Sequence, residues 1–216
     1  MIAKLIWNKR NDFVFGKGFS HPNQLINRAK RDLDLFNQIQ RQPDGVQGTK
    51  DQAAVKWIRL PKDWYKLNWD AALSDTRGRL GVGGILRNSD GQMVGTIQAQ
   101  RHLRLDAFSG EAYAMMVCVN FCREMEVNRF ILEGDALRVV KLLSGAQEDW
   151  SYGGLIIKEA KMLLNRFTEW HAVHTKREGN KAAHVLAKGA LSLNEDVYDF
   201  EEVPLCVQHV VASDML

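Results

Sequence analysis

The chain has 216 residues and a mass of 24.6 kDa, which suits one domain with an extension and excludes a large multidomain enzyme. Hydrophobic residues make up 45% and charged residues 25%, as in globular proteins, and 17 glycines with only 4 prolines exclude a collagen-like or low-complexity chain. The net charge of +3 is unevenly distributed, because residues 1–62 carry +7, residues 63–191 carry +2 and residues 192–216 carry −6. We therefore expect a polyanion such as nucleic acid to favour the N-terminal region.

The apolar stretches are shorter than the ~18 residues that a membrane helix needs, and Lys4, Lys9 and Arg10 interrupt the N-terminal candidate for a signal peptide. We expect a soluble intracellular protein, in the nucleus or the cytoplasm, that does not bind membranes. The spacing of Cys118, Cys122 and Cys206 fits neither a disulfide framework nor a paired zinc motif, so we expect reduced thiols that fill the core.

The first 56 residues differ in sequence pattern from the rest of the chain. Between Leu25 and Ile39 apolar residues recur at spacings of three, four and seven, which predicts a helix after an N-cap at Asn23. Residues 40–56 then combine proline and glycine with polar side chains, which is typical of a linker. We predict a basic, partly helical N-terminal extension over residues 1–39 and a linker over residues 40–56.

From residue 57 onward, strand and helix patterns alternate. Tyr65, Leu67 and Trp69 alternate with polar residues, which predicts a strand, and two more strands follow after polar turns, as in an antiparallel meander. The remaining predicted elements are, in chain order, a helix over 109–124, a strand over 129–133, helices over 136–143 and 155–166, a strand over 167–174 and a helix over 180–191. This order predicts an α/β domain over residues 57–191, with a mixed sheet and helices packed on it, followed by an acidic C-terminal tail over residues 192–216.

Several common site types are excluded by their spacing. Residues 81–84 lack a GxGxxG motif and a Walker lysine, so they predict a strand against which another element packs closely. The sequence also contains no nucleophile elbow and no HExxH motif.

Acidic side chains at the ends of predicted elements are the strongest chemical signal. Asp70 ends an apolar strand, Glu111 lies in the first predicted helix of the domain and Asp135 lies where a strand becomes a helix. In an open α/β sheet such positions meet in one crevice, and three confined carboxylates repel each other unless cations such as Mg²⁺ or Mn²⁺ neutralise them. The alternatives are a helix cap for Asp135, a helix-dipole partner for Glu111 and a turn residue for Asp70. Glu133 shares a strand face with Asp135 and is a rival ligand.

Two histidines are further candidates for the metal site. His184 follows the helix-capping Asn180 by four residues, on a helix face with small alanines that permits a close approach. His174 lies at the end of a predicted strand. Either imidazole can ligate a metal or move a proton, and the alternative for both is an ordinary core or surface histidine.

Five ordered motifs resemble those of type 1 ribonuclease H, and in particular the plant ribonuclease H-like domains associated with non-LTR retrotransposon reverse transcriptases. The motifs are Lys66-Leu-Asn-Trp-Asp70-Ala, Gly83-Gly-Ile-Leu-Arg87, Glu111-Ala, Glu133-Gly-Asp135 and Arg177-Glu-Gly-Asn180-Lys-Ala-Ala-His184-Val-Leu-Ala. The resemblance covers residues 57–212. It implies a ribonuclease H-like α/β fold: a five-stranded mixed sheet, with an antiparallel meander and then parallel strands, and helices on both faces.

The resemblance also implies a site. Asp70, Glu111 and Asp135 match the first three metal-binding carboxylates of the family, and His184 stands where the fourth carboxylate usually is, as a ligand or a proton relay. His174 matches the spacing of a mobile-loop histidine that assists product release. Ala107, Phe108 and Leu137 stand where family enzymes have polar side chains that read the RNA.

The implied function is that of a monomeric endonuclease that hydrolyses the RNA strand of RNA–DNA hybrids with two Mg²⁺ ions, or with Mn²⁺ as a substitute. The expected contacts to nucleic acid are Lys66, Arg87, Lys176, Arg177, Asn180 and Lys181. The alternative is a catalytically weak or inactive nucleic-acid-binding module derived from a retrotransposon, which the histidine at position 184 and the missing polar readers favour. A third reading is a fragment of such an element without a selected role.

Overall fold

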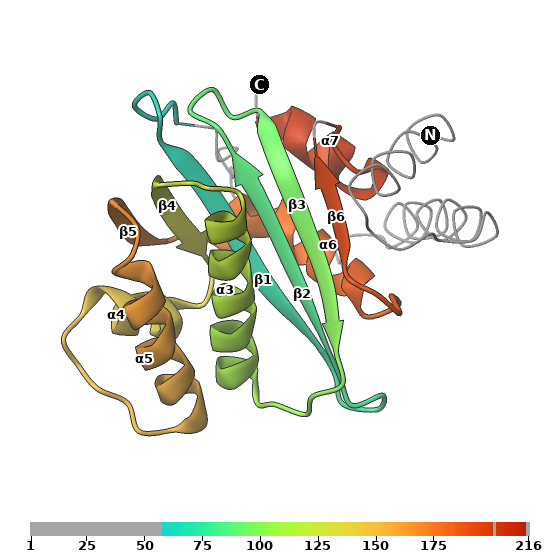
Figure 1. Ribbon diagram of the computed structural model, residues 1–216. Coiled ribbons are helices and arrows are strands. Elements are labelled where there is room, and N and C mark those ends of the chain that lie inside the picture. The colour runs from blue at the N-terminus through green and yellow to red at the C-terminus, as the bar shows by residue number, and fades with distance from the viewer. Residues whose placement is uncertain (1–57, 201, 215–216) are drawn as a thin grey trace, which may run out of the picture. The chain divides into compact units, whose positions relative to one another are not determined.

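The computed structural model describes residues 58–200 and 202–214, which form a six-stranded mixed sheet with helices on both faces (Figure 1). The predicted extension over 1–39 and the predicted linker over 40–56 lie outside the described residues. No helix of the described part is long and apolar enough to cross a membrane.

The strands follow the order β5-β4-β1-β2-β3-β6 across the sheet. The pairs β1–β2, β2–β3 and β3–β6 are antiparallel, whereas β1–β4 and β4–β5 are parallel. The meander followed by parallel strands is therefore confirmed. The strand bounds are β1 (Tyr65–Ser74), β2 (Arg79–Arg87), β3 (Met93–Arg101), β4 (Arg129–Gly134), β5 (Glu169–His174) and β6 (Val197–Phe200).

The prediction of five strands was wrong, because β6 adds a sixth at the edge of the sheet. In β6 Val197 and Asp199 are buried while Tyr198 and Phe200 are partly exposed, which is the alternation of an edge strand. Only four residues carry this pattern, and the neighbouring acids conceal it in the sequence. The segment predicted as an acidic tail thus contains β6 and the helix α7 (Leu205–Asp214), which packs against α6 (Lys181–Ala190).

Helices cover both faces of the sheet, as predicted. A Cβ atom on Gly84 of β2 would lie 2.6 Å from Sγ of Cys118, whereas one on Gly83 would lie 2.2 Å from the backbone nitrogen of Ala187 in α6. Successive strand residues point to opposite faces of the sheet. Cys118 belongs to α3, so α3 and α6 lie on opposite faces of the sheet (Figure 1). The bounds of the helices not yet given are α3 (Ala107–Glu124), α4 (Leu137–Ser144), α5 (Tyr152–Leu164) and the short 3₁₀ helix η1 (Arg177–Asn180).

The glycine run of β2 sets the position of α6. Because Gly83 has no side chain, the backbone of α6 approaches the strand at Ala183 and Ala187, which are themselves small and buried. The close packing predicted for residues 81–84 is confirmed. Gly83 is also the antiparallel partner of Asp70 in β1, so this approach brings α6 beside Asp70.

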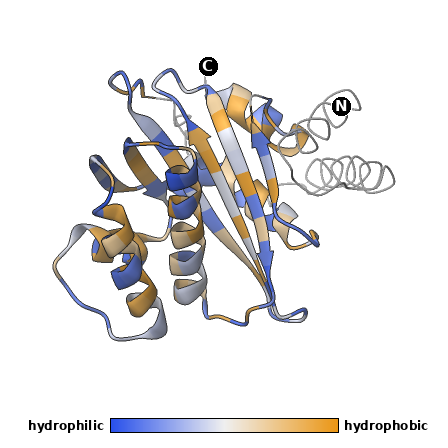
Figure 2. Ribbon diagram, in the orientation of Figure 1, coloured by the Kyte–Doolittle hydropathy of each residue, from blue (hydrophilic) through white to orange (hydrophobic). Residues whose placement is uncertain are grey.

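The largest hydrophobic cluster lies between the sheet and α3, α4 and α5. Trp69, Phe130 and Met115 are among its fully buried side chains, and Cys118 and Cys122 fill space between them as predicted. Figure 2 shows hydrophobic residues along the strands and helices, with mainly hydrophilic residues in the turns between strands. The polar residues that lie within this apolar frame are therefore the ones that need a functional or structural explanation.

Candidate metal centre

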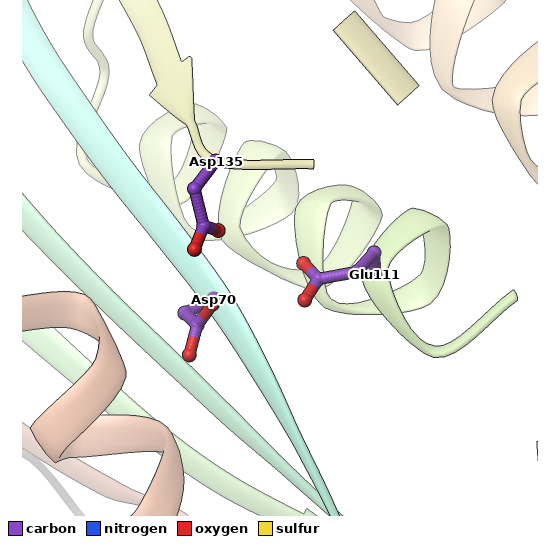
Figure 3. Close-up of side chains that lie close together, drawn as sticks. All are labelled: Asp70, Glu111 and Asp135. Atoms are coloured by element: carbon purple, nitrogen blue, oxygen red, sulfur yellow. The ribbon is translucent and has the colours of Figure 1, made fainter. Parts of the chain in front are cut away.

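Three carboxylates converge at one end of the β1–β4 pair. Asp70, Glu111 and Asp135 each offer one oxygen atom, and these atoms lie within 4.8 Å of one another. Figure 3 shows the side chains pointing toward each other from β1, from α3 and from the end of β4. The convergence expected from the sequence is therefore present in the fold.

The structural alternatives for the three acids do not apply. Asp70 lies inside β1, which continues to Ser74, so it does not open the turn. The helix α3 begins at Ala107 after an Asp106 cap and has no acidic residue in its first turn, so Glu111 is not placed to complement the helix dipole. The N-cap of α4 is Ala136, so Asp135 does not cap that helix. The acids are therefore held at positions where local helix or turn chemistry does not explain them.

Burial makes the acid cluster electrostatically costly. Desolvation raises the pKa of Asp70, and the hydrogen bond from His184 offsets this effect only in part. Desolvation, with the charges of Asp70 and Asp135, raises the pKa of Glu111 to about 9. Oε2 of Glu111 is buried and has no hydrogen-bond partner among the described residues. An all-oxygen donor set with one unpartnered buried oxygen fits a divalent cation such as Mg²⁺.

His184 adjoins the cluster but is not one of its three members. Its Nδ1 atom lies 2.7 Å from Oδ2 of Asp70, and its side chain is 20% exposed. Arg177 also contacts the ring, with Nη2 3.0 Å from Nε2 and 3.3 Å from Nδ1 of His184. The structure therefore places His184 at the site as expected, with Asp70 as its partner.

A buried hydrogen-bond network that includes Asn180 and Asn68 supports Asp135. Asn180 is 1% exposed, and its Nδ2 donates to the carbonyl of Trp69 at 2.8 Å and to Oδ1 of Asp135 at 3.3 Å. Its Oδ1 accepts from Nδ2 of Asn68 at 3.3 Å, and Asn68 also donates to Oε1 of Glu133 at 3.0 Å. Asn180 is the N-cap residue of α6 as predicted, but its side chain makes no cap hydrogen bond and belongs to this network instead. Its burial also argues against the expected contact with nucleic acid.

Replacing Asn180 by alanine should lower the free energy of unfolding by ~1–3 kcal/mol, because the mutation leaves buried polar groups of β1 without partners. It should also weaken divalent-ion binding, since Asp135 loses a donor that orients it. Urea unfolding, monitored with and without Mn²⁺, measures both effects.

The matched control is Asn128→Ala, which truncates an exposed asparagine whose side chain donates to the backbone carbonyl of Glu126, two residues away. This control should change stability by less than ~0.5 kcal/mol. Equal stability of the two variants would contradict the role of the Asn180 network.

Two of the cations that were expected to contact phosphates form ion pairs within the protein. Nζ of Lys66 lies 3.1 Å from Oε2 of Glu133 and its side chain is 12% exposed, so Glu133 is engaged there and is not a member of the acid cluster. Nη2 of Arg87 lies 2.8 Å from Oδ2 of Asp214 in α7, and its side chain is 4% exposed. Each of these two cations is thus paired with an acid far away in the sequence, and their contact with a nucleic acid stays a prediction.

The other predicted contacts lie at the surface. Lys176, Arg177 and Lys181 are exposed in and beside η1, and Nη1 of Arg177 lies 3.8 Å from Oδ2 of Asp135. His174 is exposed at the end of β5, where it is the parallel partner of Gly134, and Asp135 comes directly after Gly134. His174 thus lies at the same edge of the sheet as Asp135, outside the three-acid cluster.

The supporting role of Asn68 was not predicted from the sequence. Asn68 and Asp70 lie on the same face of β1 by the two-residue period, and the parallel register places Asn68 opposite Glu133. The two-residue period predicted only that Asn68 lies on the polar face of this strand, and the burial of that face depends on how α6 packs against β1. The contact of Arg177 with His184 was also missed, because it depends on how η1 joins α6.

The fold and the three converging acids define a ribonuclease H-like domain. The pattern of the reverse transcriptase-like family matches residues 68–190, which is more than half of the chain, and the chain therefore belongs to that family. The resemblance stated from the motifs is confirmed.

Individual proteins agree with this assignment. A protein of Arabidopsis thaliana, provisionally named as a ribonuclease H protein, is 26% identical over 172 residues; the match covers 80% of this chain and 28% of that protein. The chain therefore spans only about a quarter of this relative's length. The structure of ribonuclease H1 from Halobacterium salinarum is 26% identical, covers 59% of this chain and 97% of its own, and superposes with a TM-score of 0.55. The LC11 ribonuclease H1, solved in complex with an RNA/DNA hybrid, shares the fold at 14% identity, with 59% of this chain and 96% of its own covered and a TM-score of 0.53.

Proposed function

We propose that this protein hydrolyses the RNA strand of RNA–DNA hybrids in a reaction that depends on divalent cations. The observation that carries this proposal is the meeting of Asp70, Glu111 and Asp135, with ligand oxygens within 4.8 Å and one of them buried without a partner. Membership of the reverse transcriptase-like family and the likeness to the Halobacterium ribonuclease H1 support it.

In this proposal Asp70, Glu111 and Asp135 would hold two divalent ions, Mg²⁺ or Mn²⁺. Bound ions of this kind supply an activated water and stabilise the leaving 3′ oxygen. The chain's own residues do the rest. Asn180 orients Asp135, His184 orients Asp70, and the surface cations Lys176, Arg177 and Lys181 bind the phosphates that flank the cleaved bond.

A cleavage assay with the full chain tests the proposal. A labelled RNA–DNA hybrid should give shorter RNA products in the presence of Mg²⁺ or Mn²⁺ and none after chelation with EDTA, while a DNA duplex of the same sequence should stay intact. Absence of RNA products over full titrations of both metals would overturn the proposed activity.

The second candidate is a nucleic-acid-binding module with little turnover. The observation that favours it is the histidine bound to Asp70 at the position of the fourth carboxylate, with Arg177 beside it. A binder of this kind retains the hybrid in a salt-sensitive manner, because phosphate contacts release counterions, and yields no product. Binding and cleavage measured on the same hybrid therefore separate the two functions.

A further inference from the structure

Glu133 lies at the far end of a series of hydrogen bonds that leads to the acid cluster. Its Oε2 atom lies 3.1 Å from Nζ of Lys66, and its Oε1 atom accepts from Nδ2 of Asn68 at 3.0 Å. The side chains of Lys66 and Glu133 are only 12% and 15% exposed, so the protein shields this ion pair from most of the solvent. Both carboxylate oxygens of Glu133 are therefore engaged within the protein.

The next two members of the series use all of their amide hydrogens. Nδ2 of Asn68 donates one hydrogen to Glu133 and the other to Oδ1 of Asn180, at 3.3 Å. Nδ2 of Asn180 donates to the carbonyl of Trp69 at 2.8 Å and to Oδ1 of Asp135 at 3.3 Å. Asn68 is 4% exposed and Asn180 is 1% exposed, so water does not readily replace these partners.

The hydrogen bonds of this network all run in one direction. A carboxylate accepts hydrogen bonds and cannot donate them, so Glu133 fixes which end of the Asn68 amide faces it. With its nitrogen turned this way, Asn68 donates to the amide oxygen of Asn180. The nitrogen of Asn180 is then turned toward Asp135. The opposite orientation places an amide oxygen against a carboxylate oxygen, where like partial charges repel each other.

We propose that Glu133, acting through Asn68 and Asn180, is a positioning residue that orients Asp135 for a divalent cation. The other oxygen of Asp135, Oδ2, lies 3.8 Å from Nη1 of Arg177, whose side chain is 65% exposed, so the buried donor to this carboxylate is Asn180. Partners behind a metal ligand orient it, and their loss commonly lowers metal affinity. The inference rests on the proposed function for its biological meaning, and its test measures metal binding separately from cleavage.

Glu133→Gln tests the direction of the network. The oxygen of the glutamine amide should face the ammonium of Lys66, so that its nitrogen faces Asn68. Asn68 and then Asn180 must reverse their amides, which brings an amide oxygen against Asp135. Calorimetric titration of the nucleic-acid-free full chain with MnCl₂ should therefore show about tenfold weaker binding than in the wild type.

Lys66→Met in the same chain should restore the binding. Without the ammonium, the glutamine amide can present its oxygen to Asn68, as the carboxylate of Glu133 does. Lys66→Met/Glu133→Gln should then bind Mn²⁺ within about threefold of the wild type. A role limited to stability predicts the opposite, because the double variant has lost a further interaction. Urea unfolding with EDTA present shows whether each variant is folded.

The matched control is Glu169→Gln, which removes an exposed carboxylate of the neighbouring strand β5 that pairs with His171 and should leave Mn²⁺ binding unchanged. Asn68→Ala interrupts the network while the Lys66–Glu133 pair stays intact, and it should weaken binding by a similar factor. A folded Glu133→Gln variant with wild-type affinity, or a folded double variant that binds no better than Glu133→Gln, would overturn the inference. If Glu133→Gln does not fold, a folded Asn68→Ala variant with wild-type affinity overturns it instead.

Failure of this inference is distinguishable from failure of the proposed function. Weaker Mn²⁺ binding by Glu133→Gln that Lys66→Met restores, without hybrid cleavage by the wild type, would support the positioning role and contradict the nuclease. Hybrid cleavage by the wild type, with an unchanged Mn²⁺ affinity in folded Glu133→Gln, would support the nuclease and overturn the positioning role. Absence of any saturable Mn²⁺ binding by the wild type would overturn both.

Discussion

Replacement of Glu111 by glutamine should raise the free energy of unfolding of the metal-free protein at pH 8 by ~2 kcal/mol. The carboxyl group of Glu111 has a pKa of about 9 in the folded chain against 4.5 in the absence of its surroundings. The folded state therefore binds more protons than the unfolded state between these values, and stability must fall as the pH rises through that window. At pH 8 this difference corresponds to at most ~5 kcal/mol, and water that enters the site lowers the folded-state pKa and reduces the cost.

The glutamine removes the charge, so the decline in stability between about pH 4.5 and pH 9 should become much shallower. Urea unfolding at several pH values with EDTA present measures this decline. Glu159→Gln, an exposed glutamate of α5, is the matched control and should leave the decline unchanged. Mg²⁺ should reverse the trend for the wild type, because an ionised Glu111 is then stabilised by the ion. A wild-type chain whose metal-free stability is constant from pH 5 to pH 9 contradicts the burial of this charge.

Asp70→Asn should lower the rate of hybrid cleavage by ~10³-fold or more, which corresponds to ~4 kcal/mol of lost transition-state stabilisation. Asp70 is one of the three acids of the proposed metal site, and an amide oxygen is a weaker ligand than a carboxylate for a hard divalent ion. The fold should be retained, because the asparagine keeps the shape of the side chain and removes a buried charge. Single-turnover cleavage of a labelled hybrid measures the rate.

Asp75→Asn is the control for this substitution, since Asp75 is exposed in the turn after β1 and outside the cluster. It should cleave at the wild-type rate. Cleavage by Asp70→Asn at more than a tenth of the wild-type rate would show that the hydrolysis takes place elsewhere or comes from a contaminating nuclease.

Local patterns in the sequence were sufficient to predict most of the fold. The alternation around Trp69 and the polar turns predicted the meander, because a half-exposed strand has a period of two whatever its partners are. The glycines of β2 and the alanines of α6 together predicted a close approach of two elements. The edge strand β6 was missed since its four residues are too few to show a period against acidic neighbours.

The acid cluster could be predicted because Asp70 and Asp135 lie near the same edge of neighbouring parallel strands, and topology brings such positions together. The cations could not be assigned in this way. Lys66 is paired with Glu133 and Arg87 with Asp214, and each partner is brought close only by the tertiary fold. Charge alone does not show whether a lysine or an arginine faces solvent or a buried acid.

The central claim is that Asp70, Glu111 and Asp135 together bind a divalent cation. The most direct measurement is anomalous diffraction from crystals of the full chain grown or soaked with Mn²⁺. We predict a manganese peak at ~2.0–2.2 Å from one oxygen of each of the three carboxylates. The account is contradicted by crystals that hold Mn²⁺ in millimolar concentration and show no anomalous peak between these side chains.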